Sequence, residues 1–197
     1  MKGRESGMPE EDQWSSFFNP EAILDRLLPM EARTGNLVEF GAGYGTFTLP
    51  AARRVTGKVT ALDIEPAMIA LVRDKAADEG LANVEAAVRD FVAEGTGLAD
   101  GSQQHAMIYN LLHIENPVTL LREARRVLAV GGSLSVMHWR SDIPTPRGPS
   151  REIRPTADQC RVWMEDAGFV SIASPDIGDT APYHFGLFAY REGDPRL

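Results

Sequence analysis

Three glycines alternate within residues 41–45 (GAGYG), and they carry the strongest chemical signal in the sequence. They follow the apolar run 37–40, which is suited to a buried strand, and they precede a segment that can form a helix. A turn without Cβ atoms can bend tightly and let its backbone approach a ligand closely. A second apolar strand, 59–62, ends at Asp63, and in a doubly wound sheet this places a carboxylate beside the turn. Its two oxygens can accept hydrogen bonds from the vicinal hydroxyls of a ribose.

The elements that must position these groups follow from hydrophobic periodicity and turn residues. Strands are expected at 36–40, 58–62, 83–88, 106–111, 134–138, 169–173 and 184–190. Helices are expected at 20–30, 45–55, 66–80, 117–130 and 156–167, and a loop is expected at 91–104. Five alternating β/α units that end in a hairpin predict an α/β fold. We expect a mostly parallel seven-stranded sheet with a C-terminal antiparallel hairpin and helices on both faces. Residues 14–197 should form a single domain after a disordered polar tail at 1–13.

The spacing around the turn differs from that of a dinucleotide-binding fingerprint. Thr46 stands where the pattern G-x-G-x-x-G would place its last glycine, and Glu39 lies two residues before the first glycine. The pattern E-x-G-x-G-x-G, followed by an acid at the end of the next strand, resembles the class I S-adenosylmethionine (SAM) dependent methyltransferases. The resemblance extends over roughly residues 36–190. It implies the Rossmann-like methyltransferase fold, with SAM as cofactor and S-adenosylhomocysteine as product.

The resemblance also implies roles for the residues that match the family's cofactor site. The residues concerned are Glu39, Gly41, Gly43, Gly45, Asp63, Ile64, Asp90, Phe91 and Asn110. Glu39 would help to hold the methionine end of SAM, directly or through water. Asp63 would accept from both ribose hydroxyls, and the backbone carbonyl of Asn110 would meet the SAM amino group. Alternatively, Glu39 only bonds a neighbouring backbone group, because a carboxylate in an apolar strand needs some partner.

The adenine end of the cofactor is assigned in the same way. Asp90, in the sequence VRDF, resembles the acid that accepts from the adenine amino group. Ile64 would pack on the adenine ring, and Phe91 would offer its backbone N–H and an apolar face. The alternative for Asp90 is a helix cap at the protein surface.

Three histidines are expected at the same edge of the sheet. His113 follows the fourth strand, His138 ends the fifth, and His184 begins an antiparallel last strand whose start lies at the carboxyl ends of the parallel strands. Methyl transfer is an in-line displacement, so the protein need only align a nucleophile, exclude water and remove a proton where one must leave. We expect at least one of these three candidate catalytic histidines to contact the substrate. The alternative for each one taken singly is a hydrogen-bonded structural residue rather than the general base. No carboxylate or cysteine joins them at metal-ligand spacing, so no metal site is predicted.

A basic loop is predicted after the fifth strand, at 140–155, where four prolines exclude a long helix. It carries Arg140, Arg147, Arg151 and Arg154 against Asp142 and Glu152. Arg140 and Arg147 are candidates for binding an anionic group of the substrate, because arginine pairs with carboxylate or phosphate through two parallel hydrogen bonds. Tyr183, at the start of the last strand, is a further candidate substrate contact. The alternative is a solvated loop without a ligand.

The segment before the first helix contains Trp14, Phe17 and Phe18, which are too apolar for a free tail. We expect them to pack down as a lid over the cofactor, with a plain N-terminal anchor as the alternative.

Composition narrows the function classes. The net charge of −8 over 197 residues disfavours nucleic acid or an anionic membrane as partner. Cys160 is the single cysteine, which excludes an internal disulfide and suits a cytoplasmic protein. No apolar run approaches the length of a membrane span. The partner that the resemblance implies is a small-molecule methyl acceptor.

Within the family, the sequence looks most like the small-molecule branch, the ubiquinone-biosynthesis-like or type 11 group. One cysteine disfavours arsenite methylation, and the amino-methylating N/DPPY motif is absent at Asn110. Methylation at an O, C or S atom of a small molecule is therefore expected. Two alternatives stay open: an NAD-dependent oxidoreductase, which would share the glycine turn and Asp63 but not explain Asp90, and a non-catalytic SAM-binding regulatory protein.

Overall fold

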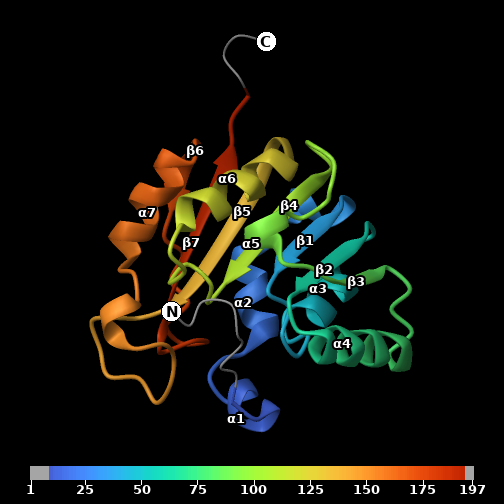
Figure 1. Cartoon of the computed structure of the whole chain (residues 1–197), viewed down its shortest axis with the longest axis horizontal. Helices are drawn as coiled ribbons and strands as arrows, with labels where there is room; N and C mark the ends of the chain where they lie inside the picture. The colour runs from blue at the N-terminus through green and yellow to red at the C-terminus, as the bar shows by residue number, and fades with distance from the viewer. Residues whose placement is uncertain (1–8, 194–197) are drawn as a thin grey trace.

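A computed structural model describes residues 9–193 of the chain, and within them seven strands form one sheet in the order β3-β2-β1-β4-β5-β7-β6 (Figure 1). The strands are β1 (Leu37–Phe40), β2 (Val59–Asp63), β3 (Val84–Val88), β4 (Gln103–Tyr109), β5 (Leu128–Trp139), β6 (Phe169–Ala173) and β7 (His184–Arg191). The pairs from β3 through β5 are parallel, and β7 is antiparallel to both β5 and β6. This confirms the predicted parallel sheet with a C-terminal antiparallel hairpin.

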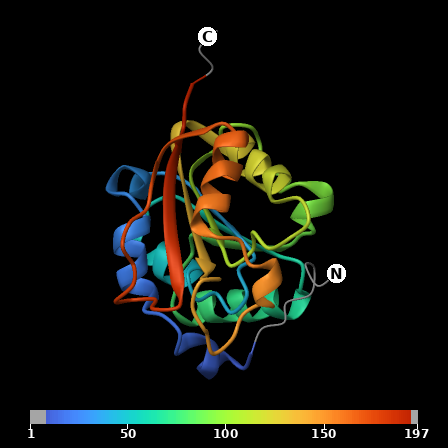
Figure 2. The same ribbon diagram turned by 90° about the vertical axis from the view of Figure 1, so that its left-hand side faces the viewer.

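Helices cover both faces of the sheet, which Figure 2 shows edge-on with α2 in blue on one side and α7 in orange on the other. The α-helices are α1 (Glu11–Ser15), α2 (Pro20–Leu27), α3 (Thr48–Arg54), α4 (Pro66–Asp78), α5 (Phe91–Glu94), α6 (Pro117–Val127) and α7 (Ala157–Asp166), and the 3₁₀ helices are η1 (Met30–Thr34) and η2 (Arg151–Ile153). One core cluster packs α6 and α7 on the sheet, and a second packs α2 and α3 on its other face. Among residues 9–193, no helix is long and apolar enough to cross a membrane.

Side chains of a strand alternate between the two faces, and this alternation decides what each site residue can reach. In β1, Val38 and Phe40 belong to the core under α6 and α7, whereas Leu37 belongs to the core under α2 and α3. Glu39 has the parity of Leu37, and it contacts Thr48 of α3. In β5, Val136 faces the α6 and α7 side, so that His138 does as well.

Several element boundaries differ from those predicted. The helix expected at 20–30 ends at Leu27, because Leu28 precedes Pro29 and is extended (φ −110°, ψ 101°). The helix expected at 45–55 begins at Thr48, after Gly45 adopts a φ of 77°, which leaves Pro50 in the first turn, where its missing N–H costs nothing.

The connection from α6 to β5 was also predicted wrongly. Gly131 does not end a helix: α6 stops at Val127, and β5 begins at once with Leu128. Gly131 lies inside the strand with a φ of 76°, close to the register shift where β4 passes from Gln103 to His105. A glycine of positive φ can serve as a bulge as well as a helix stop, so the sequence signal was ambiguous.

Two segments that were expected to lack secondary structure contain a helical turn. Residues 91–104 were predicted to be a loop, but α5 forms at Phe91, capped by the side chain of Asp90. The tail at 1–13 was predicted to be disordered, but residues 11–13 belong to α1; residues 1–8 lie outside the described residues. Both turns are four or five residues long, too short for a periodic pattern to reveal them.

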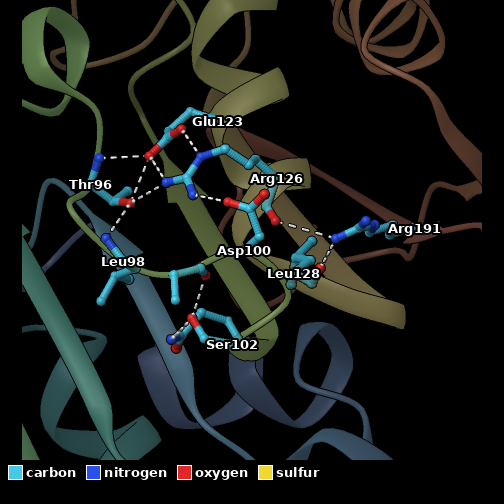
Figure 3. A network of polar contacts seen from close by, with 10 residues as sticks. Thr96, Leu98, Asp100, Ser102, Glu123, Arg126, Leu128 and Arg191 are labelled. Atoms are coloured by element: carbon cyan, nitrogen blue, oxygen red, sulfur yellow. Dashed lines mark hydrogen bonds and ion pairs between the residues drawn. The ribbon is translucent and has the colours of Figure 1, made fainter.

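A polar network fixes the segment after α5 against α6 (Figure 3). Glu123 accepts from the backbone N–H and the hydroxyl of Thr96 (2.7 and 2.6 Å) and from Arg126, which also pairs with Asp100. Arg126 and Thr96 hold the pKa of Glu123 down at about 2, so this carboxylate stays ionised at neutral pH. The network therefore supports the wall of the site described below and offers no free acid or base.

Candidate cofactor and active site

The glycine turn is held in place by the end of β2. The N–H groups of Gly41 and Ala42 donate to the carbonyl of Leu62 (2.8 and 3.0 Å), and the N–H of Gly43 donates to Oδ2 of Asp63 (2.8 Å). Gly41 has a φ of 76°, and a Cβ there would lie 3.0 Å from Leu111 Cδ1. The positive φ thus favours glycine here, and a Cβ would in addition crowd the side chain of Leu111 in the loop after β4.

Asp63 is 5% exposed and organises this region before any ligand is considered. Its Oδ1 accepts from the N–H of Glu65 (3.0 Å), while its Oδ2 accepts from Gly43. An ionised carboxylate has about four acceptor positions, so two further hydrogen bonds can still form. The predicted ribose contact is compatible with this geometry, and the structure adds a second task for Asp63, the fixing of the turn.

Glu39 is 2% exposed at the second-last position of β1, and the hydroxyl of Thr48 donates to its Oε2. Burial raises the pKa of Glu39 to about 8, the Thr48 hydrogen bond opposes this, and the nearby charge of Asp63 adds to it. Thr48, at the start of the helix after the turn, was not recognised in the sequence. A buried acid with one hydroxyl partner beside the turn suits a role in holding a cationic ligand group.

The adenine-site candidates lie at the ends of β2 and β3. Asp90 caps α5 by accepting from the N–H of Ala93 (3.0 Å), which is the capping alternative raised by its sequence context. Phe91 is buried and packs edge-on against Phe40 (ring centroids 5.3 Å apart), and Ile64 is half-buried after Asp63. This capping contact uses Oδ1 of Asp90. The roles of Asp90, Ile64 and Phe91 toward adenine stay predictions.

Asn110 has the most unusual conformation at this edge of the sheet. Its φ is 58°, which is rare for a residue other than glycine, and this ends β4 at Tyr109 rather than at the predicted residue 111. Its backbone N–H donates to the carbonyl of Met137 (2.7 Å). Both polar atoms of its side chain are buried without a hydrogen-bond partner among residues 9–193. These two features favour the predicted role of Asn110 in the cofactor site, which stays a prediction.

The three candidate histidines divide between the two faces of the sheet. His113 and His138 are in contact, with 3.2 Å between Nδ1 of His113 and Nε2 of His138. His184 pairs in register with Trp139, the residue after His138, and therefore faces the α2 and α3 side. There it packs against Trp139 and Phe18, and both ring nitrogens are buried without a hydrogen-bond partner in the described part of the chain. Burial lowers the pKa of His184 to about 3 and leaves this ring neutral. The structure thus brings two of the three histidines together.

The arginines of the 140–155 loop bond mostly to the loop itself. Arg140 forms two hydrogen bonds with Asp142 (3.0 and 2.6 Å), and Arg151 donates to the carbonyl of Ser141. Arg154 is 8% exposed and donates to three carbonyls of the loop and its base, those of Arg140, Arg147 and Pro149. The sequence did not reveal this internal role, in which Arg154 supplies hydrogen-bond donors to carbonyl groups that no regular secondary structure satisfies.

Tyr183 lies beside the 140–155 loop. Its backbone carbonyl accepts from the N–H of Arg140 (2.8 Å), which joins the start of β7 to the end of β5. Its side chain is half-buried against the second core cluster. The roles of Arg140, Arg147 and Tyr183 toward a substrate stay predictions.

The N-terminal aromatic segment contacts the glycine turn directly. Nε1 of Trp14 donates to the hydroxyl of Thr46 (3.1 Å), and the hydroxyl of Tyr44 donates to the carbonyl of Pro9 (2.8 Å). Phe17 and Phe18 are 5% and 7% exposed and are part of the core under α2 and α3. The segment therefore combines a lid-like contact at Trp14 with an anchor at the two phenylalanines.

This division predicts different outcomes for two truncations. Removing residues 1–16 is expected to preserve folding but to weaken cofactor retention, because the contacts to Tyr44 and Thr46 are lost while Phe17 and Phe18 stay in the core. Removing residues 1–18 is expected to lower stability as well, since deleting a buried phenylalanine side chain costs about 3–5 kcal/mol. Urea unfolding and calorimetric SAM titration of both proteins check this. Unchanged SAM affinity after the shorter truncation would exclude the lid.

With this geometry described, comparison with known proteins identifies the domain. Residues 37–132 match the family described as "Methyltransferase domain". These residues match a methyltransferase domain, which supports the predicted class I SAM-dependent family. The matched residues run from the start of β1 to the bulge in β5, and so include the glycine turn, Asp63, Asp90, Asn110 and His113.

Curated relatives of the methyltransferase domain are two ubiquinone/menaquinone biosynthesis C-methyltransferases, both named UbiE. The protein from Hydrogenovibrio crunogenus is 33% identical over 112 residues, which cover 54% of this chain and 43% of that protein. The protein from Methylobacterium nodulans is 30% identical over 130 residues, which cover 62% of this chain and 50% of that protein. The chain thus spans about half the length of the curated relatives it matches.

Solved structures share the fold of the methyltransferase domain at low sequence identity. A SAM-dependent methyltransferase from Aquifex aeolicus superposes with a TM-score of 0.76 at 22% identity, covering 91% of this chain and 93% of that one. Geranyl diphosphate C-methyltransferase from Streptomyces coelicolor A3(2) gives 0.71 at 18% identity, covering 94% and 84%. The [4+2]-cyclase SpnF gives 0.73 at 18% identity, covering 98% and 85%. Because a cyclase shares this fold, the fold alone does not determine the reaction.

Proposed function

We propose that the protein binds SAM and transfers its methyl group to an O, C or S atom of a small molecule. The observation that carries the proposal is the glycine turn held by Asp63, with the buried Glu39 in the strand that leads into it and the unsatisfied Asn110 at the end of the neighbouring β4. The family match and the C-methyltransferases among its relatives support the same reading. The residues proposed to hold the cofactor are Glu39, Gly41, Gly43, Gly45, Asp63, Ile64, Asp90, Phe91 and Asn110.

Each end of the cofactor would meet a different kind of group. The ribose hydroxyls would donate to the remaining acceptor positions of Asp63, and the methionine end would lie near Glu39 and Asn110. Bound SAM supplies an activated methyl group on a sulfonium, so the protein's own task is to align the acceptor, exclude water and take up a proton. Trp14, over the turn, would help with the second of these tasks.

The proposal is tested by binding and turnover in one series. We expect calorimetry to show binding of SAM and S-adenosylhomocysteine and no binding of NAD(H). Incubation with SAM and a panel of phenols, thiols, quinols and carbon acids, followed by mass spectrometry, should detect S-adenosylhomocysteine and a methylated product. Binding of SAM without turnover across the panel would favour the regulatory alternative, and binding of NAD(H) alone would favour the oxidoreductase.

We further propose a small-molecule acceptor in the cytoplasm, in line with the single cysteine and the net charge of −8. Arg140, Arg147 and Tyr183 are proposed to contact an anionic group of that acceptor. Asp142 already pairs with Arg140, so an anion must compete with this carboxylate for the guanidinium.

This competition gives a test with two opposite outcomes. Arg140→Ala should raise the KM for an anionic acceptor, whereas Asp142→Asn should lower it, because the amide binds the guanidinium more weakly than the carboxylate does. Effects of about tenfold or less are expected, since both side chains are partly exposed. SAM affinity, measured by calorimetry, should stay the same in both variants. If both are kinetically silent, the loop has no role in acceptor binding.

A further inference from the structure

A cavity of about 890 Å³ opens beside the candidate site, between α5, the start of α6 and η2. Its walls are largely apolar and include Phe91, Val92, Leu120 and Ile153. The glycine turn and Asp63 do not line it, and Phe91 is the one wall residue that also belongs to the proposed cofactor contacts. His113 also lines this cavity.

His113 is tied to the end of β5 by a directional chain of hydrogen bonds. Nδ1 of His138 lies 3.1 Å from the backbone carbonyl of Trp139, and Nε2 of His138 lies 3.2 Å from Nδ1 of His113. A carbonyl oxygen can only accept, so Nδ1 of His138 must carry the hydrogen. In a neutral imidazole the other nitrogen is then an acceptor, and Nδ1 of His113 must donate to it.

The chain of hydrogen bonds ends at Nε2 of His113, which keeps a free lone pair. With its hydrogen on Nδ1, a neutral His113 has an unprotonated Nε2, and this atom has no hydrogen-bond partner among the described residues. Burial keeps His138 neutral by lowering its pKa to about 3, and it also lowers the pKa of His113. The backbone carbonyl of Trp139 thereby sets the tautomer of His113, which lies on the loop after β4.

The two carboxylates on the cavity wall are less suited than His113 to take a proton from a ligand. Glu123 is occupied by Thr96 and Arg126 (Figure 3), and Glu115 is exposed to solvent. His113 is half-buried between the apolar surface and His138, and the hydrogen-bond chain would spread the positive charge of its protonated ring toward the Trp139 carbonyl.

We propose that Nε2 of His113 accepts the proton of a methyl acceptor bound in this cavity, and that His138 is the positioning residue that presents this nitrogen unprotonated. The proposal rests on the proposed methyl transfer and narrows its substrate class to a largely apolar molecule with an O–H, S–H or acidic C–H group. The proton leaves that group and forms the N–H bond at Nε2. The electron pair left on the acceptor forms the bond to the methyl carbon, and the carbon–sulfur bond breaks with its pair on sulfur. The imidazolium then returns its proton to solvent.

The tautomers can be read without any substrate. The sequence has four histidines, so ¹⁵N-histidine-labelled protein gives four ring systems in long-range ¹H–¹⁵N NMR spectra, which single His→Gln variants assign. At pH 7.5 we expect both His113 and His138 as Nδ1–H tautomers with unprotonated Nε2. His138→Phe should shift His113 toward the Nε2–H form that predominates for histidine in water.

Two variants control for packing. His138→Gln offers an amide oxygen to His113 and an amide N–H to the Trp139 carbonyl, so it should keep the Nδ1–H form of His113. Phe185→Leu removes a ring stacked on His138 (centroids 6.2 Å apart) without touching the hydrogen bonds, and should leave both tautomers unchanged. An Nε2–H tautomer of His113 in the parent protein, or an unchanged tautomer in His138→Phe, would overturn the proposed role of His138.

Turnover then tests the role of Nε2. With the phenol, thiol and carbon-acid panel, His113→Gln should lower kcat by about 10²–10⁴-fold, as expected for loss of a general base, with unchanged SAM affinity. His138→Phe should lose less, and His138→Gln should recover part of that loss. Full activity of His113→Gln would refute the proposed base. Absence of SAM binding in the parent protein would instead refute the proposed function, whatever the tautomers are.

Discussion

Replacing Asp63 with alanine is expected to weaken SAM binding by about one to two orders of magnitude. The variant loses charge-assisted hydrogen bonds to the ribose, which contribute on the order of 1.5–3 kcal/mol. It also leaves the N–H groups of Gly43 and Glu65 without their acceptor, so the turn itself should loosen. Calorimetry with SAM measures the first effect and urea unfolding measures the second.

The two effects of Asp63 can be separated with a modified ligand. An S-adenosylhomocysteine analogue without ribose hydroxyls should bind the parent protein more weakly than S-adenosylhomocysteine does, and Asp63→Ala should no longer distinguish the two. Asp74→Ala, on the exposed face of α4, is the matched control and should change neither affinity nor stability. Equal losses for both ligands in Asp63→Ala would mean that Asp63 acts only through the turn.

Glu39 is expected to make the stability of the ligand-free protein fall as pH rises. Its pKa is about 8 in the folded protein against a value of 4.5 for a free side chain. Below pH 4.5 both states are protonated and there is no effect. Between pH 4.5 and 8 the unfolded chain ionises while the folded protein keeps its proton, so stability falls by up to about 1.4 kcal/mol per pH unit. Above pH 8 this loss is complete.

Glu39→Gln should abolish this dependence and make the protein more stable at pH 8 than the parent. Urea unfolding from pH 5 to pH 9 checks this, and the same slope in both proteins would contradict it. Thr48→Val should extend the loss to higher pH, because the Thr48 hydroxyl lowers the pKa of Glu39.

The same carboxyl group links proton release to cofactor binding. If the cationic methionine end of SAM lies beside Glu39, binding should favour the ionised form and release up to about one proton near pH 7. Calorimetric titrations in phosphate and Tris buffers, which differ in ionisation enthalpy, measure this release. Glu39→Gln should release no proton on binding and should bind SAM more weakly. The carboxyl group of Glu39 would thus lower the stability of the ligand-free protein and strengthen the binding of SAM.

The sequence by itself determined the succession of strands along the chain, the mostly parallel sheet with its C-terminal hairpin, and the position of the glycine turn. Each strand is a short apolar run between turn residues, and right-handed crossovers leave few ways to arrange five β/α units and a hairpin. The turn could be recognised because Gly41 and Gly45 adopt a positive φ, a local backbone conformation that glycine favours and that the spacing of glycines in the sequence indicates. Asp63 was found by the same local logic, since it ends the strand that follows.

Only the tertiary structure decided which side chains meet. His113, His138 and His184 end up near one edge, yet the two-residue alternation of β5 and the antiparallel register of β7 put His184 on the opposite face from the other two. The loop arginines bind carbonyls and Asp142 because an irregular backbone needs partners that the sequence pattern does not name. Local conformation depends on neighbouring residues and can be predicted from them. Contacts such as Glu39 with Thr48 or His113 with His138 depend on how separate elements pack, so they appear only once the chain is folded.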